Sequence, residues 1–123
     1  MSPHSRTLVV KLTAGVEDAE RVSQAFTVAS TALASGVPVS LWLTGEGSWL
    51  AVPGRAESFD LPYAASLAEL RDALLAEGRV TVCTQCAARR SLSESDLVAG
   101  AQIRGAAAFV EEVMAEGAQA LVY

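Results

Sequence analysis

Short apolar segments rich in β-branched residues alternate with segments of helical period along the whole chain. The extended segments are residues 7–13, 38–43, 79–83, a very short one at 102–104, and 119–123. Helical segments separate them, and parallel neighbours in a sheet need such crossovers. The alternation therefore predicts an α/β fold, a three-layer α/β/α sandwich around a mostly parallel sheet. With no internal repeat or linker, we expect a single domain over residues 1–123.

Apolar periodicity and capping residues delimit the helices. The first has its apolar residues at helical spacing and ends at Gly36, and the second opens with the capping-box pattern Ser66-x-x-Glu69 and ends at Gly78. We expect their inward faces to comprise Val22, Ala25, Phe26, Ala29, Ala32 and Leu33 in the first, and Leu67, Leu70, Ala73 and Leu74 in the second.

Two further helices are predicted in the second half of the chain. A short one covers residues 84–90, and a longer one covers 106–116 with Phe109, Val110, Val113 and Met114 facing inward. Residues 93–96 have the pattern of another helix start. Residues 48–52 fit either a short helix or an extended piece.

Composition and charge exclude several classes of protein. Hydrophobic residues make up 51% and charged residues 19%, which does not fit a disordered chain. The net charge of −5 argues against direct nucleic-acid binding and against an anionic membrane surface. No apolar run is long enough to span a membrane, and we see no signal peptide, so we expect a cytoplasmic protein.

The chemistry of the chain centres on the two cysteines, Cys83 and Cys86, in a C-x-x-C pattern. Cys83 ends a predicted strand and precedes a helix, so we expect its sulfur to face unpaired N–H groups that stabilise a thiolate. Arg89 and Arg90 follow about two turns later and add positive charge. Such a thiol suits sulfur transfer, disulfide exchange or peroxide reduction. The alternative is that Cys83 is simply a small buried hydrophobe.

Cys86 admits three interpretations. It is one thiol of a redox pair, one ligand of a zinc ion, or an accessory residue beside a single working Cys83. A structural zinc takes four ligands, whereas this chain offers Cys83, Cys86 and the distant His4, so a second copy or carboxylates would have to contribute. We favour the accessory role and expect no metal and no cofactor.

The loops that follow the first two strands hold the other candidate residues. Sites in parallel sheets lie beyond the carboxyl ends of the strands, which points to Gly15, Gly45, Gly47 and Trp49 as substrate- or partner-binding residues. The alternative for the glycines is a tight turn, and the chain has no complete nucleotide-binding glycine motif. Binding of a small molecule or nucleotide by these loops therefore has the weakest support.

Taken in order, these segments resemble the DsrE/DsrF-like superfamily of sulfur-relay proteins. The likeness covers nearly the whole chain. It rests on the first strand with Ala14-Gly15, on residues 42–47 (WLTGEG), on residues 82–90 (VCTQCAARR), and on the stretch 96–105 before the last helix and strand. Many relatives have glycine where this chain has Ser91.

The resemblance implies a fold of five parallel strands, assembly into homotrimers or homohexamers, and a sulfur-accepting cysteine at the position of Cys83. We therefore expect a sulfurtransferase-like carrier that holds a persulfide on Cys83 between donor and acceptor proteins. Cys86 matches a second cysteine of some stand-alone relatives. The alternative function is a non-catalytic homo-oligomeric binding protein in which Cys83 and Cys86 bind zinc or act as a redox thiol pair.

Overall fold

A five-stranded, all-parallel sheet forms the centre of the protein, with the strand order β4-β3-β2-β1-β5. The computed structural model describes residues 6–123. The strands are β1 (Thr7–Leu12), β2 (Val39–Leu43), β3 (Arg79–Cys83), β4 (Gln102–Arg104) and β5 (Ala118–Val122). The α-helices are α1 (Ala19–Ala34), α2 (Leu67–Glu77), α3 (Thr84–Arg89) and α4 (Ala106–Val113). The predicted fold class is confirmed.

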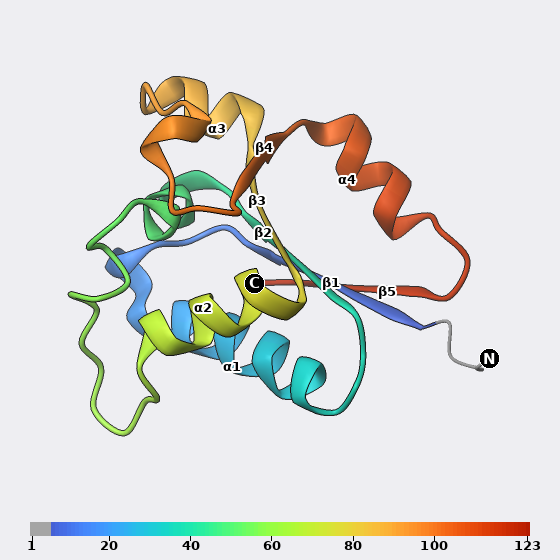
Figure 1. The fold of residues 1–123 in the computed structure, drawn as a ribbon, viewed down its shortest axis with the longest axis horizontal. Coiled ribbons are helices and arrows are strands. Elements are labelled where there is room, and N and C mark those ends of the chain that lie inside the picture. The colour runs from blue at the N-terminus through green and yellow to red at the C-terminus, as the bar shows by residue number, and fades with distance from the viewer. Residues whose placement is uncertain (1–5) are drawn as a thin grey trace.

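The helices lie on both sides of the sheet (Figure 1). Helices α1 and α2 pack together under one face, α4 crosses the other, and α3 continues from the end of β3. Because side chains alternate along a strand, Leu41 and Leu43 of the central strand β2 point toward α1 and α2. Ser40 and Trp42 point toward α4, where both donate hydrogen bonds to its Glu112.

The face under α1 and α2 carries the apolar core. It joins strand residues such as Val10, Leu41 and Val80 to Phe26 of α1 and Leu74 of α2. The predicted capping box of α2 is formed in half: the Ser66 side chain accepts a hydrogen bond from the Glu69 N–H, but the Glu69 side chain makes no hydrogen bond back to the Ser66 N–H. Gly36 follows α1 with φ +88°, as predicted. Both helix ends could be predicted from the sequence, because a helix cap depends only on residues that are close to it in the chain.

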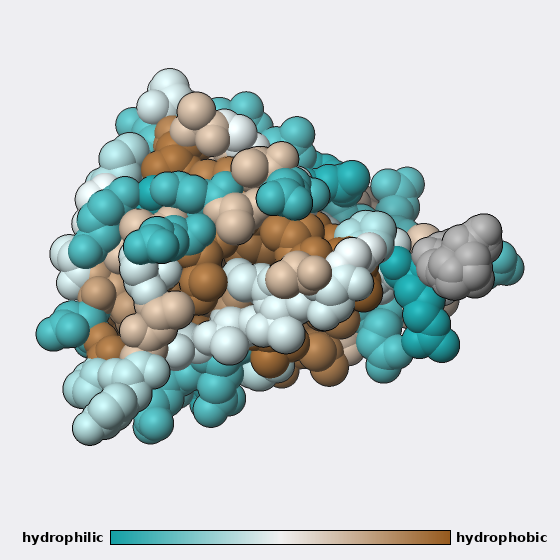
Figure 2. Space-filling view, turned by 60° about the horizontal axis from the view of Figure 1, so that its bottom comes forward, coloured by the Kyte–Doolittle hydropathy of each residue, from teal (hydrophilic) through white to brown (hydrophobic). Residues whose placement is uncertain are grey.

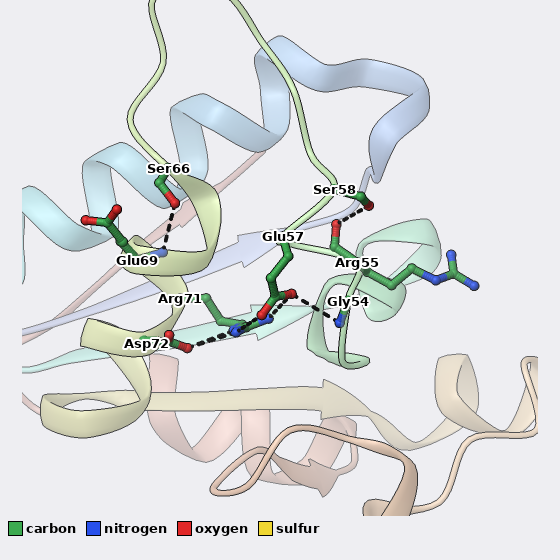
Figure 3. A network of polar contacts seen from close by, with 8 residues as sticks. All are labelled: Gly54, Arg55, Glu57, Ser58, Ser66, Glu69, Arg71 and Asp72. Carbon is green, nitrogen blue, oxygen red and sulfur yellow. Dashed lines mark hydrogen bonds and ion pairs between the residues drawn. The ribbon is translucent and has the colours of Figure 1, made fainter.

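One charged residue interrupts the predicted apolar face of α2. Arg71 is only 4% exposed, and its guanidinium donates to both carboxylate oxygens of Glu57, at 3.1 and 2.7 Å, and to Asp72 (Figure 3). Glu57 in turn accepts from the N–H of Gly54. The ion pair between Arg71 and Glu57 therefore holds the long connection between β2 and α2 against α2.

Helix α4 differs from its prediction in length and in orientation. It ends at Val113, and Val110 and Met114, which we expected to face inward, are 53% and 77% exposed. Phe109 does face the sheet, where it meets Trp42 edge-on with ring centroids 5.3 Å apart. Helix α4 has eight residues and packs on the sheet along one side only. The apolar side chains on its outer side therefore have no partner among residues 6–123.

Three connections between strands and helices contain 3₁₀ segments, and the first of them, Val16–Asp18 (η1), leads from β1 into α1. Residues Gly45–Ala51 (η2) wind as a 3₁₀ helix directly after β2, where we expected a turn and then either helix or strand. Residues Glu94–Asp96 form another, η3, with a reciprocal capping box between Ser93 and Asp96, which confirms a helix start there.

The outer surface is not uniformly polar. On the side that Figure 2 shows, hydrophobic residues gather in the middle and hydrophilic ones lie around the rim. Among residues 6–123, no helix is both long and apolar enough to cross a membrane.

Candidate functional site: the carboxyl ends of β1, β2 and β3

The candidate site lies where the first three strands end at the same edge of the sheet. Strand β3 runs directly into α3, and β2 runs into η2, which contacts both α3 and β3. The segment after β1 packs against the start of η2. The three loops that the sequence pointed to are therefore brought together, as the parallel arrangement requires.

The glycines of these loops allow two backbone segments to touch. A Cβ on Gly15 would lie 2.5 Å from the carbonyl oxygen of Glu46, and one on Gly47 would lie 2.8 Å from that of Ala14. Gly45 has φ +53° and faces the Thr13 carbonyl just as closely. These glycines therefore have a packing role, which explains them without a bound ligand.

Cys83 is the last residue of β3 and the N-cap of α3. Its side chain is half-buried and its thiol is free. Strand alternation places it on the same face as Arg79 and Thr81, and its register partner on β4 is Arg104. The expected placement at a strand end before a helix is confirmed.

The Cys83 sulfur makes no capping hydrogen bond with the first turn of α3. The backbone of Cys83 is extended, with φ −65° and ψ 133°, which is usual for an N-cap residue. Stabilisation of a Cys83 thiolate by the N–H groups of this turn therefore stays a prediction.

The other cysteine receives a backbone hydrogen bond. The N–H of Gly45 lies 3.2 Å from Cys86 Sγ and donates to it. The sulfur of Cys86 is therefore directed toward η2, whereas Cys83 lies on the sheet face. This contact was not predictable from the sequence, because it joins residues 41 positions apart.

The two arginines after the cysteines have different surroundings. Arg90 donates twice to Glu46 Oε2, at 3.1 and 2.8 Å, and once to the carbonyl oxygen of Cys86 at 3.0 Å. Its charge is therefore paired, and it ties α3 to η2. Arg89 is exposed and makes no hydrogen bond or ion pair with the residues that the structure describes.

A second charged group lies on the same face as Cys83. Glu112 of α4 accepts hydrogen bonds from Ser40 Oγ and Trp42 Nε1 on one carboxylate oxygen, and from Arg79 and Arg104 on the other, each at 2.7–2.9 Å. Burial alone would raise the pKa of Glu112, but these donors outweigh it and hold the pKa below its ordinary value. We did not predict this cluster, because it joins Glu112 to strand residues that lie far from it in the sequence.

Arg104 joins this cluster to Cys83. Its guanidinium carbon lies 5.8 Å from the centroid of the Trp42 ring, and its backbone pairs with that of Cys83. A hollow of about 450 Å³ beside it is lined by Arg79, Glu94, Gln102 and Arg104. The face that bears Cys83 is therefore polar and partly open.

Trp49, a candidate site wall, lies within η2 and is half-buried. The guanidinium carbon of Arg55 lies over its ring, 4.5 Å from the centroid. This contact gives Trp49 an intramolecular partner and holds η2 against the loop that follows it.

Neither cysteine belongs to a cluster of three or more His, Cys, Asp or Glu side chains able to hold a metal ion within residues 6–123. His4 lies outside the described residues. A zinc ion on Cys83 and Cys86 would still need ligands from a second copy.

Residues 7–123 match the model of the DsrE/DsrF-like family, which is the family that the residues around Cys83 suggested. The chain belongs to this family. Its members are generally related to sulfur relay. A search of curated proteins found no match.

Two solved structures share the fold of this family member. The YchN protein from E. coli superposes with a TM-score of 0.78 at 15% identity, covering 96% of this chain and 99% of that one. The protein of unknown function MTH1491 from Methanobacterium thermoautotrophicum gives a TM-score of 0.71 at 12% identity, covering 97% and 100%. At such identities the likeness shows the fold alone.

Proposed function

We propose that this protein carries sulfane sulfur as a persulfide on Cys83 and passes it from a donor to an acceptor thiol. The observation that carries the proposal is the place of Cys83 in a DsrE/DsrF-like fold. It is a free, half-buried thiol at the carboxyl end of β3, on the polar and partly open face of the sheet.

The transfer needs no external oxidant or reductant. The Cys83 thiolate attacks the outer sulfur of a donor persulfide, R–S–SH, so that the donor leaves as R–S⁻ and Cys83 becomes Cys–S–SH. An acceptor thiolate then attacks that outer sulfur, takes it as a new persulfide, and releases the Cys83 thiolate. Each step breaks one S–S bond and forms another, and the proton stays with the transferred sulfur.

The groups around Cys83 make its face of the sheet polar. Its register partner is Arg104, whose guanidinium donates to Glu112 at 2.7 Å. Arg90 is likewise paired, with Glu46. The proposal therefore rests on the free thiol of Cys83 and its place in the fold, and not on an unpaired cation beside it.

Cys86 serves as an accessory residue in this proposal. Its sulfur accepts the Gly45 N–H, which keeps it on the η2 side of α3. In a loaded protein without an acceptor, Cys86 can attack Cys83–S–SH, release HS⁻ and leave a Cys83–Cys86 disulfide. This side reaction stores no sulfur, so holding Cys86 against Gly45 favours transfer to a partner.

The location and partners of the protein remain part of the proposal. We propose that it works in the cytoplasm, with sulfur-donor and sulfur-acceptor proteins as its partners, and as a homotrimer or homohexamer. No nucleic acid and no membrane is a direct partner in this account, in keeping with the net charge of −5.

Intact mass spectrometry after exposure to a low-molecular-weight persulfide tests the proposal. We expect one added sulfur atom per chain on the wild type and on Cys86→Ser, and none on Cys83→Ser. Equal loading of Cys83→Ser would contradict it. The same spectra recorded under native conditions detect bound zinc, and zinc lost from both cysteine variants without any added sulfur would favour the structural-site alternative.

A further inference from the structure

The hydroxyl of Thr81 is buried without a hydrogen-bond partner. Thr81 lies at the middle of β3 and is 0% exposed, and its Oγ1 makes no hydrogen bond with any residue among 6–123. Burying a hydroxyl without a hydrogen bond is unfavourable, whereas a valine fits a strand equally well and buries no polar atom. Packing of the sheet therefore does not account for a hydroxyl at this position.

Thr81 shares its face of the sheet with Cys83. Residues two apart along a strand point to the same side, with their side chains roughly 6.5 Å apart along the strand. Thr81 and Cys83 therefore project side by side from β3. In the unloaded protein the Cys83 sulfur makes no hydrogen bond with Thr81 Oγ1. A persulfide adds a second sulfur about 2 Å beyond the first, which brings the Thr81 hydroxyl within its reach when that sulfur turns back along the strand.

The space above Thr81 is closed by side chains of the neighbouring strands. Trp42 on β2 is its register partner. Arg104 starts from β4 beside Cys83, and its guanidinium reaches Glu112 and the ring of Trp42. Because β3 lies between β4 and β2, the Arg104 side chain crosses over β3. Arg104 thus covers the Thr81 hydroxyl from solvent, and Cys83 is its neighbour along the strand.

We propose that Thr81 binds the outer sulfur of a persulfide on Cys83, with its hydroxyl donating a hydrogen bond to that sulfur. The inference rests on the proposed function, since it requires a loaded Cys83. The ligand is the terminal sulfur of Cys83–S–SH or of its anion, Cys83–S–S⁻. Hydrogen bonds to an ionised acceptor are stronger than those to a neutral one, so the Thr81 hydroxyl favours the anion. The proton lost on ionisation goes to solvent, and no other bond changes.

Thr81 in this role acts on the stored sulfur and not on the free thiol. Its hydrogen bond lowers the free energy of the loaded protein and leaves that of the unloaded protein unchanged, so sulfur is retained on Cys83. The anion also repels an attacking thiolate, so transfer to an acceptor begins when a proton from solvent restores Cys83–S–SH. The outer sulfur lies along β3, away from η2, toward which Cys86 is directed.

A sulfur-exchange equilibrium tests the role of the hydroxyl. The protein is equilibrated with glutathione and glutathione persulfide, and intact mass spectrometry measures the loaded fraction. We expect the equilibrium constant for loading to fall roughly three- to tenfold in Thr81→Val, which is the net effect of one hydrogen bond. Thr81→Ser keeps the hydroxyl and should recover the wild-type value. The matched control is Ser30→Ala, which removes another buried, unpartnered hydroxyl, on α1 at the other face of the sheet, and should load like the wild type.

The pH dependence of the loaded protein separates sulfur binding from a structural role. Ultraviolet absorbance of the persulfide anion reports the pKa of the outer sulfur. We expect this pKa to be higher in Thr81→Val than in the wild type and in Thr81→Ser, because only a hydroxyl stabilises the anion. Thermal unfolding should show Thr81→Val to be no less stable than the wild type, since valine replaces a hydroxyl that has no partner.

The outcomes distinguish a failure of this site from a failure of the proposed function. Equal loading and equal pKa values in the wild type and Thr81→Val would overturn the Thr81 site and leave the persulfide on Cys83 intact. A wild type that takes up no sulfur on Cys83 would overturn both. A comparison that needs no variant is the pKa of the outer sulfur on the wild type, which we expect to lie below that of free glutathione persulfide. A value that is no lower would also overturn the Thr81 site.

Discussion

The two faces of the sheet are built by different means. Under α1 and α2, buried side chains such as Phe26 and Leu74 fill an apolar core. Under α4, the sheet presents Ser40, Trp42 and two arginines to the single carboxylate of Glu112. The apolar face holds the fold together, while the polar face carries Cys83 and stays partly open. A protein that must expose a sulfur atom to partners benefits from this division, because its stability does not depend on closing the site.

The largest expected effect is on the apolar face. Phe26→Ala removes a fully buried ring and should cost about 3 to 5 kcal/mol in the free energy of unfolding. Phe109→Ala on the other face removes a half-buried ring and should cost less, roughly 1 to 2 kcal/mol. Chemical denaturation monitored by circular dichroism measures both. Equal losses would mean that α4 contributes as much to stability as α1 and α2.

The next effect concerns the carboxylate that holds α4. Glu112→Ala leaves Ser40 and Trp42 without their acceptor and Arg79 and Arg104 without their shared anion. We expect a loss of about 1 to 3 kcal/mol, since buried donors lose their partners. The exposed neighbour Glu111 provides the control, because Glu111→Ala should leave stability nearly unchanged. Similar unfolding midpoints for the two variants would contradict a holding role for Glu112.

A smaller and pH-dependent effect is expected for the ion pair between Arg71 and Glu57 on the apolar side. The Arg71 guanidinium lowers the pKa of Glu57 from 4.5 to about 2. A carboxyl whose pKa is lowered on folding stabilises the folded state above its unfolded pKa, and this contribution is lost as the pH falls through the folded value.

Glu57→Gln should therefore be less stable than the wild type at neutral pH. The difference should shrink as the pH falls from 4.5 toward 2 and vanish below that range. Thermal unfolding over a pH series measures it, with Glu69→Gln as a control on the same helix side of the molecule. A difference that stays constant down to pH 2 would show that Glu57 acts through something other than its charge.

The smallest effect is local to the cysteines. Arg90→Ala removes the hydrogen bonds from Arg90 to Glu46 of η2 and to the carbonyl oxygen of Cys86. We therefore expect Cys86 to react faster with iodoacetamide, with little change in overall stability. Arg89→Ala is the matched control, since Arg89 is exposed. Peptide mapping of the labelled protein distinguishes Cys86 from Cys83. Unchanged labelling of Cys86 in Arg90→Ala would show that Gly45 alone holds it.

The sequence predicted what depends on local patterns. The strands, the Ser66 cap and the position of Cys83 at a strand end follow from periodicity and from neighbouring residues. The Gly45–Cys86 and Arg90–Glu46 contacts were not predictable, because they join residues more than 40 positions apart. For α4, the apolar pattern predicted that a helix forms but not which of its sides packs on the sheet. Val110 and Met114 follow the same spacing as core residues and yet are exposed.

A single-turnover chase tests the central claim most directly. The protein is loaded with persulfide sulfur, freed of donor and mixed with an acceptor thiol, and peptide mass spectrometry then follows the sulfur over time. The account predicts that the added sulfur resides on the peptide that holds Cys83, leaves it, and appears on the acceptor, faster than hydrogen sulfide is released. Sulfur that resides on Cys86, or that never leaves Cys83 for the acceptor, would contradict a relay through Cys83.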